Sequence, residues 1–150
     1  MSFYSELFTG TTLAFSQEQQ RILTSLLLEG YQWIIWRGYW DVNALNRQLF
    51  RNADIDKGFS LLFAAHSLMK SSEPEVADQI KKMILRNSSF SQVPNSVTGN
   101  KHFRESDYTV HRTPTWLASV RMASERVIGT ELVNEDNLKG YYMADGALYT

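Results

Sequence analysis

The sequence predicts an α+β fold in which helices precede strands, and three observations support this prediction. Residues 16–86 carry apolar side chains at helical spacing, residues 87–100 are rich in Ser, Asn, Pro and Gly, and residues 116–124 alternate like a strand. Helical segments followed by strand segments are typical of an α domain that precedes a β domain. We therefore predict a helical domain at residues 1–88 and a β domain at residues 89–150.

The composition is that of a folded protein about one domain long. The 150 residues are 43% hydrophobic and 13% aromatic, which is enough for a core, and the net charge of −1 provides no strong field for binding nucleic acid. The absence of cysteine excludes disulfides and Cys-ligated zinc. No apolar run approaches the roughly 20 residues of a membrane span, and the opening residues MSFYSELF lack the features of a signal peptide. We expect no nucleic-acid partner, no membrane partner and no signal peptide in this chain.

The first helix is predicted to begin after Ser16. A serine at this position followed by Gln19 has the spacing of a capping box, and Gly30 is a suitable C-terminal stop. Leucines on several sides of this segment predict a helix that is buried over much of its surface.

Two further helices are predicted before the Ser/Asn-rich run. Asp54 or Asp56 starts the first of them, and Pro74 suits the first turn of the second. His66 lies at the edge of an apolar face, where a packed or surface histidine is more common than a catalytic one. The expected apolar faces consist of Phe59, Leu62, Phe63, His66 and Met69 in one helix and of Val76, Ile80, Met83 and Ile84 in the other.

Large aromatic side chains are concentrated in residues 31–41. Such rings form the core of many proteins, and they also stack on the apolar faces of sugars. Both interpretations remain open for this segment, and Trp36 is our candidate for a ring that contacts substrate. The aromatic residues are Tyr31, Trp33, Trp36, Tyr39 and Trp40.

A short helix capped by Asp41 or Asn43 is expected to carry Arg47 and Arg51. Their spacing of four places both guanidinium groups on one face, where like charges repel by a few tenths of a kcal/mol. A shared anionic partner such as a polysaccharide carboxylate would remove this cost, because arginine binds carboxylates and sulfates through two parallel hydrogen bonds. The alternative is a solvated pair.

Two β segments and a dense polar run follow the boundary. Residues 101–112 and 116–124 are the β segments, and Trp116, Ala118, Val120 and Met122 share one side of the second. The polar run at residues 131–139 is either a solvated loop or part of a binding site. Residues 135–137 resemble a divalent-cation loop only weakly, because the spaced acidic pattern is missing. The sequence shows no P-loop, GxGxxG or HExxH motif, so we predict neither a metal nor a cofactor.

Several motifs in order resemble polysaccharide lyase family 8, which comprises the chondroitin, hyaluronan and xanthan lyases. They are GYWD, NRQLFR, VHRTPTW, SVRMASER and ELVNEDNLKGYY followed by DG. The resemblance covers most of the chain and implies the last helical pairs of an α/α toroid followed by the first strands of a β-sandwich. Family members are several times longer, so we expect the chain to be a piece of a larger protein. We also expect that protein to be secreted or periplasmic.

The resemblance also assigns roles to residues of this chain. Arg47 and Glu131 would hold and tune a catalytic tyrosine, because a nearby guanidinium lowers the pKa of a phenol. Arg51 would contact the substrate, and Asn134 would form a hydrogen bond within the cleft. The family's catalytic asparagine, histidine and tyrosine precede this region, and His102 and His111 do not match them. We therefore expect Glu131 to lie within reach of Arg47.

Three functions remain open at this point. The first is a piece of a lyase that cleaves uronate-containing polysaccharides by β-elimination, with an acidic polysaccharide as partner and no activity of its own. The second is a carbohydrate-binding or structural module without activity, and the third is a helical protein-interaction domain. Helices separated from their neighbours would expose an apolar face, so we also expect self-association.

Overall fold

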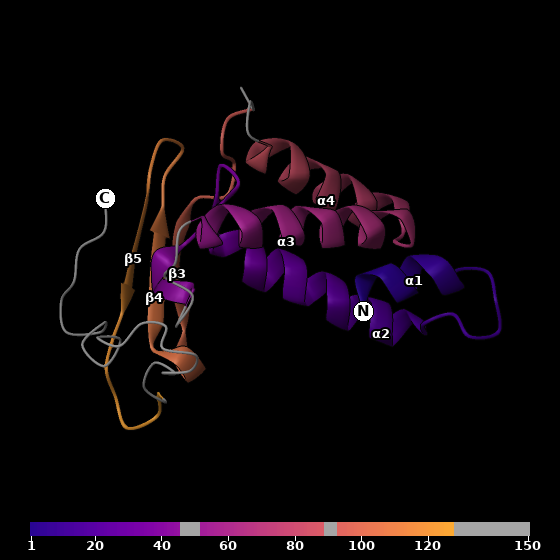
Figure 1. Ribbon diagram of the computed structural model, residues 1–150, viewed down its shortest axis with the longest axis horizontal. Coiled ribbons are helices and arrows are strands. Elements are labelled where there is room, and N and C mark those ends of the chain that lie inside the picture. Colours follow the sequence, from indigo (N-terminus) through magenta and orange to yellow (C-terminus); the bar gives the residue numbers. More distant parts are fainter. Residues whose placement is uncertain (46–51, 89–92, 128–150) are drawn as a thin grey trace.

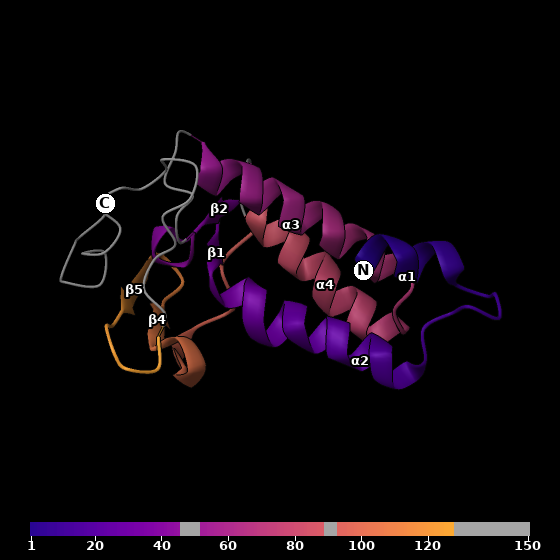
Figure 2. The same ribbon diagram turned by 60° about the horizontal axis from the view of Figure 1, so that its bottom comes forward.

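The computed structural model describes residues 1–45, 52–88 and 93–127 and has an α+β fold. The helices lie side by side at one end and a three-stranded sheet lies at the other (Figures 1 and 2). Arg47, Arg51, Glu131 and Asn134 fall outside the described residues. The elements are α1 (Ser2–Phe8), α2 (Gln17–Ser25), π-helix η1 (Leu26–Gly30), 3₁₀-helix η2 (Tyr31–Trp33), β1 (Ile35–Trp36), β2 (Tyr39–Trp40), 3₁₀-helix η3 (Val42–Ala44), α3 (Ala53–Lys70), α4 (Pro74–Asn87), β3 (Gly99–Phe103), 3₁₀-helix η4 (Arg104–Ser106), β4 (Tyr108–Arg112) and β5 (Leu117–Arg121).

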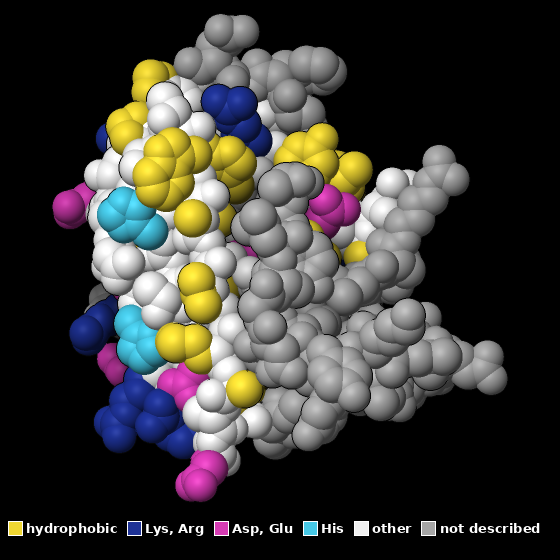
Figure 3. Space-filling view, turned by 90° about the vertical axis from the view of Figure 1, so that its left-hand side faces the viewer, with side chains coloured by type: hydrophobic (Ala, Val, Ile, Leu, Met, Phe, Trp, Pro, Cys, Tyr) yellow, Lys and Arg dark blue, Asp and Glu magenta, His cyan; other side chains and the backbone are white. Residues whose placement is uncertain are grey.

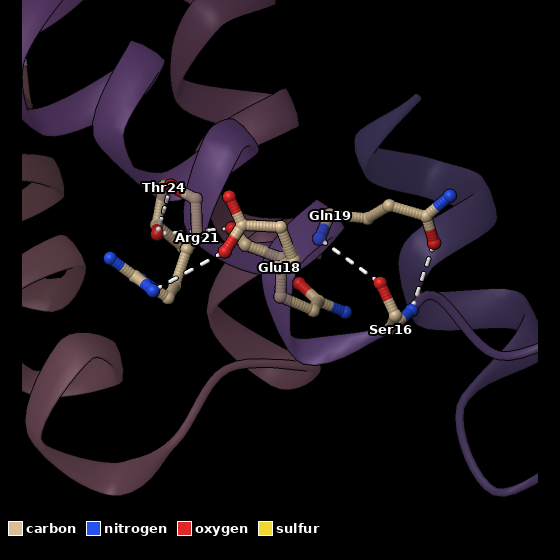
Figure 4. Close-up of polar contacts among 6 residues, drawn as sticks. Ser16, Glu18, Gln19, Arg21 and Thr24 are labelled. Atoms are coloured by element: carbon tan, nitrogen blue, oxygen red, sulfur yellow. Dashed lines mark hydrogen bonds and ion pairs between the residues drawn. The ribbon is translucent and has the colours of Figure 1, made fainter.

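The helix α2 begins as the sequence predicts. The Ser16 hydroxyl accepts a hydrogen bond from the backbone of Gln19 at 3.3 Å, and the Gln19 side chain accepts one from the Ser16 backbone at 2.9 Å (Figure 4). These two bonds satisfy N–H groups that the first helical turn cannot pair internally. The prediction of extensive burial is wrong for α2, which has no buried residue. Burial begins in η1, where Leu27 and Leu28 enter the core.

The helix α4 buries the face that its sequence predicts. Ile80 and Met83 are fully buried, and Val76 and Ile84 pack against the same core. Pro74 occupies the first turn, where its missing N–H leaves no intrahelical bond unmade.

The helix α3 begins at Ala53, close to the predicted start, but only Leu62 and Met69 of its predicted apolar face pack against the core. Phe59 and Phe63 are 72% and 62% exposed, and His66 is exposed. The prediction is wrong for these three residues because α3 packs simultaneously against α1, α4 and β2, and close packing selects small side chains. The buried residues of α3 are Ala53, Gly58, Leu61, Ala65, Ser67 and Leu68.

A two-residue hairpin turn connects β1 and β2. Arg37 and Gly38 both have positive φ, 51° and 88°, as expected for the tight turn that matches the twist of paired strands. A Cβ at Gly58 of α3 would lie 1.8 Å from the Gly38 carbonyl oxygen, and a Cβ at Gly38 would lie 2.8 Å from the Asn87 carbonyl oxygen. The hairpin therefore sits against α3 and the end of α4 with no room for side chains at these contacts.

The second sheet has the order β3-β4-β5 and is antiparallel throughout. Residues 101–112 were predicted as one β segment, whereas the structure divides them at η4 into the strands β3 and β4. Val110 is fully buried and Tyr108 is 5% exposed on the face of β4 that meets the helical part.

The opposite face of this sheet is exposed. Trp116, Val120 and Met122 lie on one side of β5, as the alternation predicts, and are 48%, 57% and 38% exposed. Figure 3 shows hydrophobic and histidine side chains on this face. In the part of the chain that the structure describes, no helix has both the length and the apolarity needed to cross a membrane.

Candidate functional site at the junction of helices and sheet

The hairpin delivers Asp41 to the junction between the helical part and the sheet. The Asp41 N–H donates to the Ile34 carbonyl at 2.8 Å, and its carboxylate accepts from the Asn43 backbone at 3.1 Å. Asp41 thereby caps η3, one of the two caps that the sequence offers for this segment. The chain then continues through Leu45 into residues 46–51, which contain both candidate arginines.

The Tyr108 hydroxyl of β4 donates a short hydrogen bond to the same Asp41 carboxylate. Burial raises the pKa of Tyr108 well above its ordinary value, and the negative charge of Asp41 raises it further. Tyr108 is therefore a neutral donor at physiological pH. It connects two segments that are 67 residues apart in the sequence.

A second bond connects the same two segments. The Asn43 side-chain amide donates to the Ser119 hydroxyl at 2.9 Å and to the Ser119 carbonyl at 3.4 Å. Ser119 pairs with Val110 in the sheet register, so it lies diagonally next to Tyr108. Two adjacent strands, β4 and β5, thus hold η3 and its N-cap Asp41 through one residue each, Tyr108 and Ser119.

Arg112 is the buried cation of the junction and is 3% exposed. Its guanidinium donates to the Gln32 carbonyl and, at 3.3 Å, to the Asn95 side chain. Burial lowers the pKa of Arg112 to about 10, and the positive charge of Arg86 contributes in the same direction. Arg112 thereby binds the aromatic-rich segment, residues 31–41, to β4.

Trp36 lies at this junction too, and it is the one predicted site residue among those described. The Arg112 guanidinium carbon lies 5.3 Å from the centre of the Trp36 ring, and that of Arg37 lies 5.8 Å from it. Both distances fall within the range of cation–π attraction. The ring is half-buried and contacts cations of its own chain.

Asp107 precedes Tyr108 and contacts the segment that follows β5. Its backbone carbonyl accepts from the Met122 N–H at 2.9 Å, and its carboxylate forms a short ion pair with Arg126. Hydrogen bonding from Ser124 and then from Arg126 lowers the pKa of Asp107 below its ordinary value. Asp107 thus remains charged and holds the chain that leads into residues 128–150.

A cleft of about 390 Å³ lies between the helical part and the sheet. Apolar groups from η1, η2 and the end of β3 line it, together with the polar side chains of Asn43, Tyr108 and Arg121. In the described ranges, no three His, Asp or Glu side chains are grouped closely enough to hold a metal ion.

The sequence did not single out the residues that form the junction. Arg112 and Tyr108 appear in it as residues of the predicted β segment at residues 101–112. The distance between Arg47 and Glu131 lies outside the described residues, so their contact stays a prediction.

Comparisons with known proteins agree with the resemblance found in the sequence. Residues 98–150 match the family model described as polysaccharide lyase family 8, super-sandwich domain. The chain is 33% identical over 91 residues to hyaluronate lyase from Thermasporomyces composti, covering 55% of this chain and 12% of that protein. It is 31% identical over 141 residues to chondroitinase-AC from Pedobacter heparinus, covering 91% of this chain and 19% of that protein.

A solved structure of chondroitinase AC lyase has the same fold over 96% of this chain and 21% of its own length. The TM-score is 0.80 and the sequence identity is 24%. The chain therefore spans about a fifth or less of the proteins it matches. The family model matches the strand half of this chain, and the chondroitinase-AC relative aligns across its helices as well, so the chain is similar to polysaccharide lyase family 8 over most of its length.

Proposed function

We propose that this chain is part of a polysaccharide lyase that cleaves uronate-containing, glycosaminoglycan-type chains by β-elimination. The support is that its relatives are named hyaluronate lyase and chondroitinase-AC, and that one of them aligns across 91% of the chain. The observation that carries the proposal is the junction itself. Side chains of β4 and β5 bind the segment that leads into Arg47 and Arg51, and β5 leads on to Glu131 and Asn134.

The reaction sets clear requirements for the site. A base removes the proton at C5 of the uronate, the electron pair forms a C4–C5 double bond, and the C4–oxygen bond breaks as the leaving oxygen takes a proton. The carboxylate charge must be neutralised, because it opposes a second negative charge at C5. We assign the groups that carry out these steps to the remainder of the protein.

The residues of this chain would support those groups. In this proposal Arg47 lowers the pKa of a catalytic tyrosine, and Glu131 orients Arg47. Arg51 and Asn134 bind the acidic polysaccharide, and Trp36 packs at the edge of the substrate cleft. The positive charges and amides match an anionic sugar chain, since guanidinium groups bind carboxylates and sulfates in pairs of hydrogen bonds.

The architecture follows the same proposal. Residues 1–88 would be the last helical pairs of an α/α toroid, and residues 89–150 would open a β-sandwich. The whole protein would be secreted or periplasmic, where its polymeric substrate is found. The apolar faces of α3 and β5 that are exposed here would drive self-association of the isolated chain.

A chimaera tests the function directly. The aligned segment of the Pedobacter heparinus chondroitinase-AC is replaced by this chain, and elimination on chondroitin and hyaluronan is followed by ultraviolet absorbance of the unsaturated product. We expect activity, and we expect Arg47→Ala and Glu131→Gln each to reduce kcat by about 10²-fold, because each removes a charge that acts on the reacting groups.

Arg21→Ala is the matched control. Arg21 pairs with Glu18 on the exposed surface of α2, so its loss should change kcat by less than about twofold. A folded chimaera that binds the polysaccharides without cleaving them would favour a non-catalytic carbohydrate-binding module. Full activity in the Arg47 and Glu131 variants would refute the roles assigned to them.

A further inference from the structure

We propose that the consecutive residues Asp107 and Tyr108 are positioning residues that hold η3 and residues 122–127 at a fixed separation. Tyr108 holds the segment that leads into Arg47, and Asp107 holds the segment that leads into Glu131. This inference rests on the proposed function, and it adds two residues to the site for which the sequence motifs gave no role.

The Tyr108 contact reaches the helical part. Its hydroxyl donates to Asp41, whose other carboxylate oxygen caps η3 through the Asn43 N–H. A single carboxylate thus couples the sheet to η3, which precedes residues 46–51 in the sequence. The bond is shielded from water, because Tyr108 is 5% exposed, and a hydrogen bond to a charged acceptor is stronger than a neutral one.

The Asp107 contact reaches the segment after β5. The Asp107 side chain is 5% exposed in its ion pair with Arg126, and its carbonyl receives the Met122 N–H. Met122 and Arg126 bracket the turn through which the chain leaves β5. Asp107 has φ 42°, a left-handed conformation uncommon outside glycine, asparagine and aspartate.

The two contacts come from neighbouring residues, and this explains how two distant segments keep one geometry. A peptide unit is rigid and consecutive Cα atoms are about 3.8 Å apart, so one short piece of backbone sets the distance between both contacts. A shift of one segment relative to the other would break one of two bonds made by buried groups. Catalysis by paired groups depends on such fixed separation.

Amide hydrogen exchange in the chain itself tests the two contacts separately. Tyr108→Phe keeps the ring and removes the hydroxyl, and we expect the amides of residues 43–45 to exchange about tenfold faster while those of residues 122–127 are unchanged. Asp107→Asn should have the opposite pattern, with faster exchange only in residues 122–127. The amides of α4 serve as the internal reference for overall stability.

Tyr31→Phe is the matched control, because Tyr31 packs against Trp40 in the same region and its ring is retained. We expect no change in either segment. Asp41→Asn adds a spectroscopic readout: removing the charge that raises the Tyr108 pKa should let that phenol ionise at lower pH. Equal acceleration of exchange in residues 43–45, residues 122–127 and α4, or no acceleration anywhere, would overturn the proposal.

Activity measurements separate this inference from the proposed function. In an active chimaera, Tyr108→Phe and Asp107→Asn should each lower kcat about tenfold and leave KM within about twofold, since alignment of the reacting groups is lost before binding. Unchanged kcat in both variants would overturn the positioning role. If the chimaera is inactive with the unsubstituted chain as well as with the variants, the proposed function is refuted. The exchange experiment still decides whether the two contacts act separately.

Discussion

The helices α3 and α4 form one packed pair, yet they contribute to the core in different ways. In α4 the large apolar side chains face inward, and Ile80 and Met83 are fully buried. In α3 the aromatic rings of Phe59 and Phe63 face outward, and small residues such as Gly58 and Ala65 face inward. Helical periodicity therefore predicts which face of a helix carries the large apolar side chains. Which face is buried also depends on how closely the neighbouring elements approach.

The difference has a geometric cause. Elements that contact α3 include α1, α4 and β2, and the Gly58 contact brings its backbone against the hairpin. A face that lies against backbone has room only for small side chains, so large ones are displaced to the other side of the helix.

Substitution of Gly58 should give the largest effect. Gly58→Ala places a Cβ 1.8 Å from the Gly38 carbonyl oxygen, so the hairpin or the helix must move, and we expect a loss of about 4 kcal/mol in the free energy of unfolding. Urea denaturation measures it. Gly30→Ala is the control, because its Cβ would meet only Leu26 Cδ1 at 3.8 Å, an ordinary contact. Similar stability of the two variants would contradict the close approach of α3 to the hairpin.

Truncation of one large residue in each helix should give the second-largest effect. Met83→Ala leaves a cavity in the core and should cost about 3 kcal/mol, whereas Phe59→Ala removes a ring that is 72% exposed and should cost less than about 1 kcal/mol. Both changes delete most of a large side chain, so they form a matched pair under the same denaturation assay. A larger loss of stability for Phe59→Ala than for Met83→Ala would indicate that Phe59 is buried, as the sequence predicted.

The contact between α1 and α3 should give the smallest effect. Lys70 donates to the Glu6 carboxylate at 2.6 Å and, with Ser67, lowers the Glu6 pKa below its ordinary value of 4.5. The stability from this pair is therefore present above about pH 4.5 and is lost as the pH falls through the lowered pKa. Glu6→Gln should lower the melting temperature slightly at neutral pH, and the difference should close in acid. A pH-independent difference would show that the charge is not the cause.

The sequence predicted much of the fold where local signals and tertiary packing agree. The Ser16 capping box, Pro74 at the start of α4 and the alternation along β5 each depend on short-range geometry, and the structure confirms all three. The face of α3 depends on contacts with distant segments, which periodicity does not contain. The division of residues 101–112 into two strands is instead a local hairpin turn at η4, which the alternation pattern did not reveal.

The site could be predicted only by resemblance and only in part. Arg47, Arg51, Glu131 and Asn134 follow from family motifs and remain predictions, and Trp36 lies at the junction with its role still to be tested. Tyr108 and Arg112 could not be singled out, because nothing local to β4 shows that their partners are Asp41 and Gln32, 67 and 80 residues away.

The hairpin tip also limits where this chain can accept extra sequence. Glycine backbone at Gly38 touches two helices, so lengthening that turn by even one residue would push it into its neighbours. The stretch from Thr9 to Ala14 is exposed, and Gly10 has nothing within 4 Å of an added Cβ. A peptide tag inserted after Gly10 should therefore be accommodated, whereas the same tag between Arg37 and Gly38 should prevent the protein from folding.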